Sequence, residues 1–492
     1  MGFGEKKKEP LNFSVGRLTI QEGTVSFSAP QLETDFTAQV TERPIPGSRA
    51  LVLHGSGLIR NGHAELKLRG DSLAAFLEPG HSFGLEGCFT WGYTHGRLGG
   101  IVESPLTFQG ANFEFEMTGP SPAVLFPITR VKLPDLPRYQ IQAHIIQQEK
   151  KWIIQNIQGI VGGSDFSGEV FFEEMEKKSR LVGRLKSNQL ALIDIGIGQD
   201  QPPENTSTPL EPIEIDVNLE FQGHRVITPL ILEEVRTLLR VKEGQLYLDS
   251  LNFGLTGGQV HAMVKLDTHY SPMPTTLDAR FQRLDLNRLL APLGIKQQDS
   301  GTLSGQAQFT SGGGSLTDIL SSAEGSAFFV VTRAQLNSLL LALARLDLAK
   351  TLNSLLFIDN SVEVRCAVAQ VRAHQGILSI TPVVIDSTST KVTGGGTVDL
   401  RRNHLDLTFE PHPKDLSLFS AYSPFHVTGS LQSPEVRPKV GPLGGRMAAA
   451  AALAALVGPV GAVMPFIEPG IGDDNDCQDL VRDTAIPFED KR

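Results

Sequence analysis

Some residues in this chain have types that could do chemistry, but their spacing matches no recognised catalytic arrangement. Gly55-Ser56-Gly57 resembles part of a nucleophile elbow, yet it falls in a predicted strand turn rather than between a strand and a helix. Gly312-Gly313-Gly314 lacks the Lys-Ser/Thr pair of a phosphate-binding loop, so it predicts a turn. We therefore expect no catalytic residues and no enzymatic activity.

Metal and cofactor sites are not expected either. The 12 histidines are scattered, and His261 and His269 are separated by an extended run, which favours structural or solvated side chains. Asp473, Asp474 and Asp476 could bind Ca²⁺, because carboxylate oxygens are its preferred ligands. An acidic solvated tail is the better interpretation of these three residues.

The 3 cysteines are Cys88, Cys366 and Cys477. They show no C-x-x-C or Cys/His ligand spacing, which argues against a zinc site. Two of them could form one disulfide in an oxidising compartment. The alternative is three free thiols, because free cysteine often behaves as a small buried hydrophobic residue.

Composition favours a folded protein built from short strands. Hydrophobic residues make up 40% and charged residues 20% of the 492 positions, which allows a buried core and argues against disorder. The 49 glycines and 30 prolines suit many turns. A net charge of −10 argues against nucleic acid as a partner, because phosphate binding needs a basic surface.

The clearest local pattern is a predicted hairpin within residues 366–438. Thr397–Leu400 alternates polar and apolar residues, and Arg401–Asn403 forms a charged turn. Leu405, Leu407 and Phe409 then alternate again. Period-2 spacing between turn residues predicts antiparallel strands with one apolar and one solvated face.

Similar strand-turn-strand patterns recur along the chain. Trp152–Phe172, Glu243–Leu266 and Gly376–Leu400 form loose copies of one unit, and Gly394–Gly396 predicts a bulge or bend before the last strand. Each unit would lean on its neighbours in one dimension. We therefore predict a mainly β fold, an elongated, repeated antiparallel sheet curled into a groove.

Two segments predict helices. Residues 333–357 contain neither Gly nor Pro and carry leucines on one face, which indicates a helix packed on the sheet or lying on a membrane surface. Residues 447–467 are uncharged and long enough to span a bilayer, but Pro459 and Pro465 interrupt them. A helical hairpin that caps the sheet or docks a partner, a segment at the membrane interface and a spanning segment all stay open.

The predicted domain organisation follows these patterns. The expected segments are an N-terminal β segment at 1–135, β repeats at 136–200 and 213–325 separated by a linker at 201–212, a helix plus β repeat at 326–440, and an Ala-rich helical segment with an acidic tail at 441–492.

A curled sheet with one apolar face would leave an apolar channel along its length. Hydrocarbon chains suit such a channel, because burial stabilises them by about 0.8 kcal/mol per CH₂ group without specific contacts. The candidate groove-lining residues are Leu246, Leu248, Leu251, Phe253, Val398, Leu400, Leu405, Leu407 and Phe409.

The C-terminal pattern resembles that of the AsmA family of Gram-negative envelope proteins. The matching pieces are Gly396–Leu400, Leu405–Leu407, Pro411–Asp415 and Ser423–Pro434, in this order and spacing. The resemblance implies a periplasmic β-groove protein associated with the inner membrane. It also implies that phospholipid acyl chains are the ligand, that the function is lipid movement and outer-membrane biogenesis, and that 447–467 contacts a membrane or an envelope partner.

The resemblance further implies a disulfide between Cys366 and Cys477 that would pin the Ala-rich segment to the sheet. Family members usually begin with a membrane helix, whereas Met1–Leu11 is charged and has no apolar core, so we expect a truncated or split reading frame, or an excised domain. The alternative function is a scaffold or chaperone for outer-membrane protein assembly, in which sheet edges pair with client strands.

Overall fold

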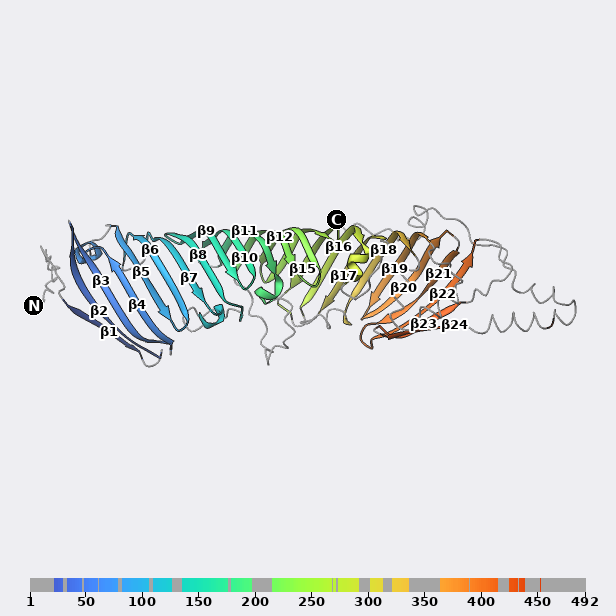
Figure 1. Ribbon diagram of the computed structural model, residues 1–492, viewed down its shortest axis with the longest axis horizontal. Coiled ribbons are helices and arrows are strands. Elements are labelled where there is room, and N and C mark those ends of the chain that lie inside the picture. The colour runs from blue at the N-terminus through green and yellow to red at the C-terminus, as the bar shows by residue number, and fades with distance from the viewer. Residues whose placement is uncertain are drawn as a thin grey trace, which may run out of the picture. The chain divides into compact units, whose positions relative to one another are not determined.

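The computed structural model describes most of the chain. The described residues are 22–29, 33–46, 48–60, 62–77, 82–105, 109–125, 135–175, 178–196, 215–267, 269–270, 273–291, 301–312, 321–335, 363–388, 390–414, 424–431, 433–438 and 452. The chain divides into two compact units, Met1–Asp200 (unit 1) and Gln201–Arg492 (unit 2). Both are dominated by strands (Figure 1).

Unit 1 contains strands joined by turns and short helical segments. Its elements are β1 (Gly23–Ala29), β2 (Thr34–Ile45), β3 (Ser48–Ile59), β4 (Gly62–Gly70), α1 (Leu73–Leu77), β5 (Phe83–Trp91), β6 (Thr94–Val102), β7 (Asn112–Gly119), η2 (Pro122–Leu125), β8 (Tyr139–Gln148), β9 (Lys151–Val161), β10 (Ser164–Glu173), β11 (Ser179–Ala191) and η3 (Leu192–Ile195).

Unit 2 has the same construction. Its elements are β12 (Ile215–Ile227), β13 (Ile231–Lys242), β14 (Gln245–Leu255), β15 (Gly258–Asp267), β16 (Pro274–Asp285), α3 (Leu286–Leu290), β17 (Thr302–Gly312), β18 (Glu324–Gln335), β19 (Glu363–His374), β20 (Ile377–Ser387), β21 (Thr390–Asp399), β22 (His404–Pro413), β23 (Phe425–Ser430) and β24 (Ser433–Pro438).

Strand order follows sequence order within each unit. In unit 1, every strand from β1 to β11 pairs antiparallel with the next. In unit 2, the same holds from β12 to β24. The antiparallel prediction is confirmed, and the recurring units correspond to the hairpins β9–β10, β14–β15 and β20–β21.

Alternation gives the sheet of each unit two different faces, because successive side chains in a strand point to opposite sides. We call one the apolar face and the other the second face. On the apolar face of unit 1, one row of cross-strand partners runs through Val40, Leu53, Leu68, Gly87, Leu98, Phe115 and Ala143. The adjacent row on the second face runs through His54, Lys67, Cys88, Arg97, Glu116, Gln142 and Gln158.

The hairpin of β21 and β22 forms as predicted, with its turn at Arg401–Asn403. The Asp399 carboxylate accepts hydrogen bonds from the backbone N–H groups of Arg402 and Arg401. These bonds, led by the one from Arg402, hold the pKa of Asp399 below its ordinary value. A carboxylate that ties down two turn amides explains why this polar segment makes a tight turn.

The Gly394–Gly396 run lies within β21 rather than before it. The register shift is between Ile380 and Val383 of β20, opposite the glycines. Gly396 has φ +152°, and a Cβ there would meet the carbonyl oxygen of Asp406 at 2.1 Å. Glycine is therefore required for the close approach of β21 to β22.

The helix prediction for residues 333–357 is wrong at its start. Residues 333–335 are the end of β18, where Gln335 pairs with Glu363 of β19. Pairing between strands overrides the helix propensity of this short stretch. Residues 336–357 lie outside the described residues, as do residues 447–467 except Ala452, which is helical.

The described helices are short. None of them is long and apolar enough to cross a membrane. The side chains of Ala75 and Phe76 in α1 pack against a cluster formed by Phe83, Val102 and Ala111 at one end of the apolar face. No second layer of strands or helices from the described residues lies along the sheet of either unit.

Candidate functional site

The nine predicted groove residues lie in two groups on the apolar face of unit 2. In β14, Leu246 and Leu248 pair with Leu266 and Val264 of β15. A register shift between Leu248 and Leu251 then keeps the later residues on the same face. As a result, Leu251 and Phe253 pair with Ala262 and Val260.

The second group forms a packed cluster in β21 to β23. Val398 and Leu405 are buried with Phe425 and Val427, and the partly buried Leu400, Leu407 and Phe409 pack against them. The rings of Phe409 and Phe425 are stacked with centroids 5.3 Å apart. These contacts confirm that the residues share a face, but the predicted role in ligand binding stays a prediction.

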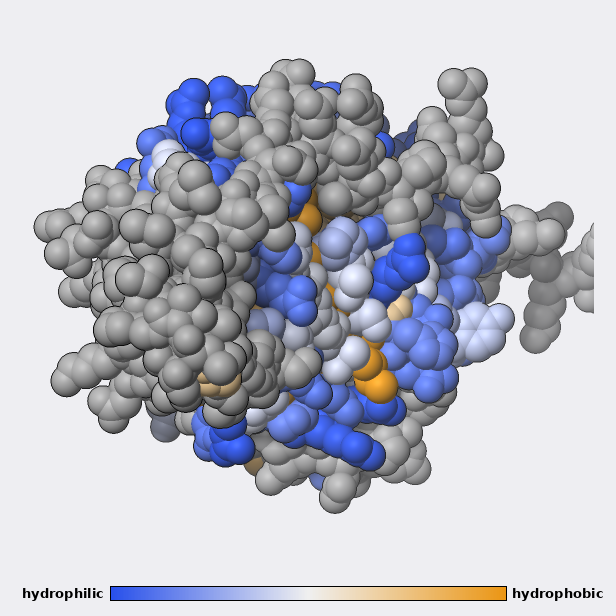
Figure 2. Space-filling model, turned by 90° about the vertical axis from the view of Figure 1, so that its right-hand side faces the viewer, coloured by the Kyte–Doolittle hydropathy of each residue, from blue (hydrophilic) through white to orange (hydrophobic). Residues whose placement is uncertain are grey.

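Cross-strand register joins the two groups into one uninterrupted row. The row consists of Leu219, Leu239, Leu248, Val264, Leu277, Phe309, Gly325, Ala373, Leu378, Val398, Leu405 and Gly429. All its members are aliphatic, aromatic or glycine. Because neighbouring strands are ~4.8 Å apart, the row is about 50 Å long. Figure 2, which views the molecule from one end, shows a few apolar residues in orange among hydrophilic ones.

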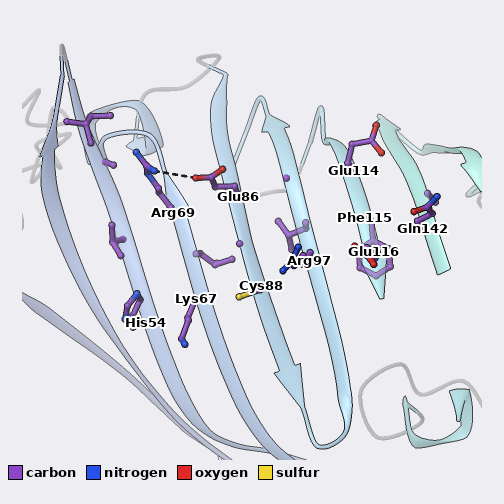
Figure 3. A pocket seen from close by; sticks show the side chains of 18 of the residues that line it. His54, Lys67, Arg69, Glu86, Cys88, Arg97, Glu114, Phe115, Glu116 and Gln142 are labelled. Carbon is purple, nitrogen blue, oxygen red and sulfur yellow. Dashed lines mark ion pairs between the residues drawn. The ribbon is translucent and has the colours of Figure 1, made fainter. Parts of the chain in front are cut away.

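The second face of unit 1 carries a hollow that the sequence interpretation missed. The cavity has a volume of about 1070 Å³ and is lined from β2 to β9 by charged and amide side chains together with apolar residues such as Ile45, Val52 and Leu98. Figure 3 shows Lys67, Cys88 and Arg97 on three neighbouring strands, with Glu116 and Gln142 further along. We call this hollow the polar trough. An ion pair joins Arg69 to Glu86 across its wall at 3.6 Å.

The second face of unit 2 is very different at β18 to β20. Cys366 is completely buried, and Val368 and Phe328 nearly so. Cys366 takes part in a disulfide. Cys88 is a free, exposed thiol. Cys477 lies outside the described residues, so its pairing with Cys366 stays a prediction.

A buried ion pair lies beside Cys366. Asp386, the cross-strand partner of Cys366, is completely buried, and Lys414 Nζ lies 2.8 Å from its Oδ1 atom. No other described group donates a hydrogen bond to either carboxylate oxygen. Neither Asp386 nor Lys414 was predicted to take part in an ion pair. The only signal was the position of Lys414 in the segment Pro411–Asp415.

The described residues contain no group of three or more His, Cys, Asp or Glu side chains that could hold a metal. Ser56 lies within β3 as the partner of Thr37, not at a strand-to-helix elbow. His261 is bonded to Asn252, and His269 to Asp267. The expectation that the chain is not an enzyme remains an expectation.

These features define a class of protein whose single-layer antiparallel sheets have one continuous apolar face. A model of the AsmA family matches residues 135–383, about half of the 492 residues. The chain belongs to the AsmA family, and is thus an envelope-associated protein of the AsmA type.

One curated relative extends the match over most of the chain. It is the AsmA family protein YhjG of Escherichia coli (strain K12), which is 26% identical over 443 residues. The alignment covers 83% of this chain and 65% of the relative, so the chain spans about two thirds of that protein's length. No solved structure matches the chain.

Proposed function

We propose that this protein binds phospholipid acyl chains along its apolar face and moves them through the Gram-negative periplasm in support of outer-membrane biogenesis. The observation that supports the proposal is the apolar row from Leu219 to Gly429, over which the described residues place no second layer. Membership of an envelope-associated family is consistent with such a role.

The physical reason is the low specificity of hydrocarbon binding. Each CH₂ group removed from water contributes about 0.8 kcal/mol, so a chain of a dozen or more carbons needs no polar contact to be held. A row without charged residues also lets a chain slide, because no position along it differs strongly from the next. The headgroup would stay in water at an edge of the sheet.

A matched pair of variants tests this proposal. Val264 and Met263 are neighbours in β15 and point to opposite faces, since Val264 pairs with Leu277 and Met263 with Asp278. Val264→Lys places an ammonium group in the apolar row, whereas Met263→Lys places it on the second face, where Met263 is 55% exposed.

The measurement is native extraction of the full chain followed by mass spectrometry of the co-purifying lipids. We expect several phospholipids per chain in the unchanged protein and in Met263→Lys, and a several-fold lower number in Val264→Lys. Circular dichroism checks that all three are folded. A folded, unchanged protein without lipid would contradict the proposal and favour the assembly-scaffold alternative.

A further inference from the structure

The polar trough of unit 1 contains cationic side chains that no described residue neutralises. Lys67 and Arg97 are exposed and take part in no ion pair or hydrogen bond within the described residues. In Figure 3 the ion pair drawn is that of Arg69 with Glu86, and neither Lys67 nor Arg97 shares in it. Unpaired cations that line one cavity are a feature of anion-binding surfaces.

The register places the two cations symmetrically about a neutral group. Lys67 and Arg97 are the two cross-strand partners of Cys88, one on β4 and the other on β6. Their backbones are therefore about 10 Å apart, two strand spacings. Both side chains are long enough to reach a group held above the Cys88 thiol. His54, the partner of Lys67 on β3, continues the row.

On this face of β4 to β6 the carboxylates are outnumbered, since Glu65 and Glu86 stand against Lys67, Arg69 and Arg97. Glu86 is paired with Arg69. Glu116 is the cross-strand partner of Arg97, but it lies on the far side of Arg97 from Cys88. The end of the trough at β3 to β6 thus has a net positive charge, and the end at β7 to β9 carries the carboxylates of Glu114 and Glu116 and three amides.

We propose that the polar trough binds a phosphate-bearing ligand, with the phosphate between Lys67 and Arg97 above Cys88. A guanidinium fork matches phosphate oxygens geometrically, and an ammonium group adds a point charge. The rest of the ligand is a body with hydroxyl or amino groups, because Glu116, Gln142 and Gln158 continue the same cross-strand row beyond Arg97. Gln142 and Gln158 already share a hydrogen bond of 2.7 Å.

This site lies on the second face of unit 1, opposite that unit's own row from Val40 to Ala143, so it goes beyond the proposed function and does not depend on it. A phosphorylated sugar and the headgroup of an anionic lipid share the chemistry that the trough would recognise. The experiment must therefore use both sources.

Cys88 supplies a natural readout, because it is a free, exposed thiol at the floor of the site. Its rate of reaction with a maleimide is followed in the full chain by mass analysis of the peptide that contains it. We expect glucose 6-phosphate at saturation to slow the reaction at least fivefold. Glucose, and potassium chloride at equal ionic strength, should leave the rate unchanged.

Variants assign the protection to the two cations. Lys67→Gln and Arg97→Gln, each compared with its own ligand-free rate, should each lose most of the protection. Lys186→Gln is the matched control, because Lys186 is an exposed lysine on the second face of β11. It should be protected like the unchanged protein. Isothermal titration calorimetry with glucose 6-phosphate gives a second readout that does not use the thiol.

A parallel series with phosphatidylglycerol vesicles and neutral phosphatidylcholine vesicles distinguishes a phosphorylated sugar from an anionic lipid headgroup as the ligand. Protection by glucose 6-phosphate supports the site with a soluble ligand, and protection by phosphatidylglycerol vesicles alone supports it with a lipid headgroup. The proposal is overturned if neither probe protects Cys88, or if Lys67→Gln and Arg97→Gln are protected as well as the Lys186→Gln control. Failure here would not affect the lipid measurements on Val264→Lys.

Discussion

The second face of the sheet is built in opposite ways in the two units. In unit 1, Lys67, Cys88 and Arg97 stand exposed in a polar trough. In unit 2, Cys366 on β19 is completely buried and Val368 nearly so. Both units keep an apolar row on the other face. The apolar face is thus the common part of the design, and the second face is where the regions diverge.

The cysteines show the consequence of this difference for one residue type. Cys88 has two cations as cross-strand partners and remains a free thiol. Cys366 has Thr332 and Asp386 as partners, is completely buried and is part of a disulfide. The same side chain is accessible for reaction in one region and structural in the other. Burial of the second face, rather than the residue type, therefore decides whether a cysteine on it is accessible or structural.

The largest expected effect comes from placing a charged side chain on the buried second face of unit 2. Val368→Lys would bury an ammonium group without a partner and should cost more than about 4 kcal/mol of unfolding free energy. Thr90→Lys, on the second face of β5, should change it by less than about 0.5 kcal/mol. Urea unfolding followed by circular dichroism measures both. Equal losses would show that the two faces do not differ as described.

The next test compares a buried ion pair with an exposed one. Asp386→Asn leaves Lys414 charged at a site where its side chain is 8% exposed, and should cost about 3–5 kcal/mol. Glu86→Gln removes a pair whose side chains are 55% and 66% exposed, and should cost less than about 1 kcal/mol. Urea unfolding again gives both values.

A double variant sharpens this second test. Asp386→Leu combined with Lys414→Met removes both charges and should recover most of the loss, because a hydrophobic pair of similar volume needs no desolvation of ions. A double variant as unstable as Asp386→Asn would contradict this explanation of the pair.

The smallest expected loss, apart from the two exposed control sites, concerns Asp165 in β10. Burial disfavours its charge, but hydrogen bonds from Gln189 N–H and from the backbone and side chain of Asn188 lower its pKa below the ordinary value of 3.8. A carboxyl with a lowered pKa stabilises the fold above its ordinary value, and this contribution is lost as pH falls through the lowered one.

Asp165→Asn should therefore cost about 1 kcal/mol at pH 7, and the difference from the unchanged protein should shrink below pH 3.8. Urea unfolding between pH 7 and pH 2.5 measures it. A difference in unfolding free energy that stays constant over this range would show that it does not come from the ionised Asp165 carboxylate.

Alternation predicted the strands and the shared face of Leu248 and Leu405 from sequence, because period 2 is visible within each strand. The polar trough could not be predicted in this way. It depends on the register that puts Lys67, Cys88 and Arg97 side by side, and their separations in sequence match no motif. The sequence feature that could have indicated the trough is the series of charged residues at alternate positions of β4.

Two other features depended on tertiary structure. Arg333, at the start of the predicted helix, belongs instead to β18, because backbone pairing with β19 continues to Gln335. The pair of Asp386 and Lys414 joins β20 to the residue that follows β22, although β21 lies between these two strands in the sheet. Composition and periodicity carry no information on such a pair.

The sequential strand order has a consequence for how the chain reaches its structure. In each unit, every strand after the first pairs with the strand that precedes it in the sequence. Pairing can therefore begin before the later strands have been made. Contacts between adjacent hairpins close short loops and are quick to form. A chain threaded slowly through a pore could therefore fold vectorially, adding one strand at a time to a growing edge.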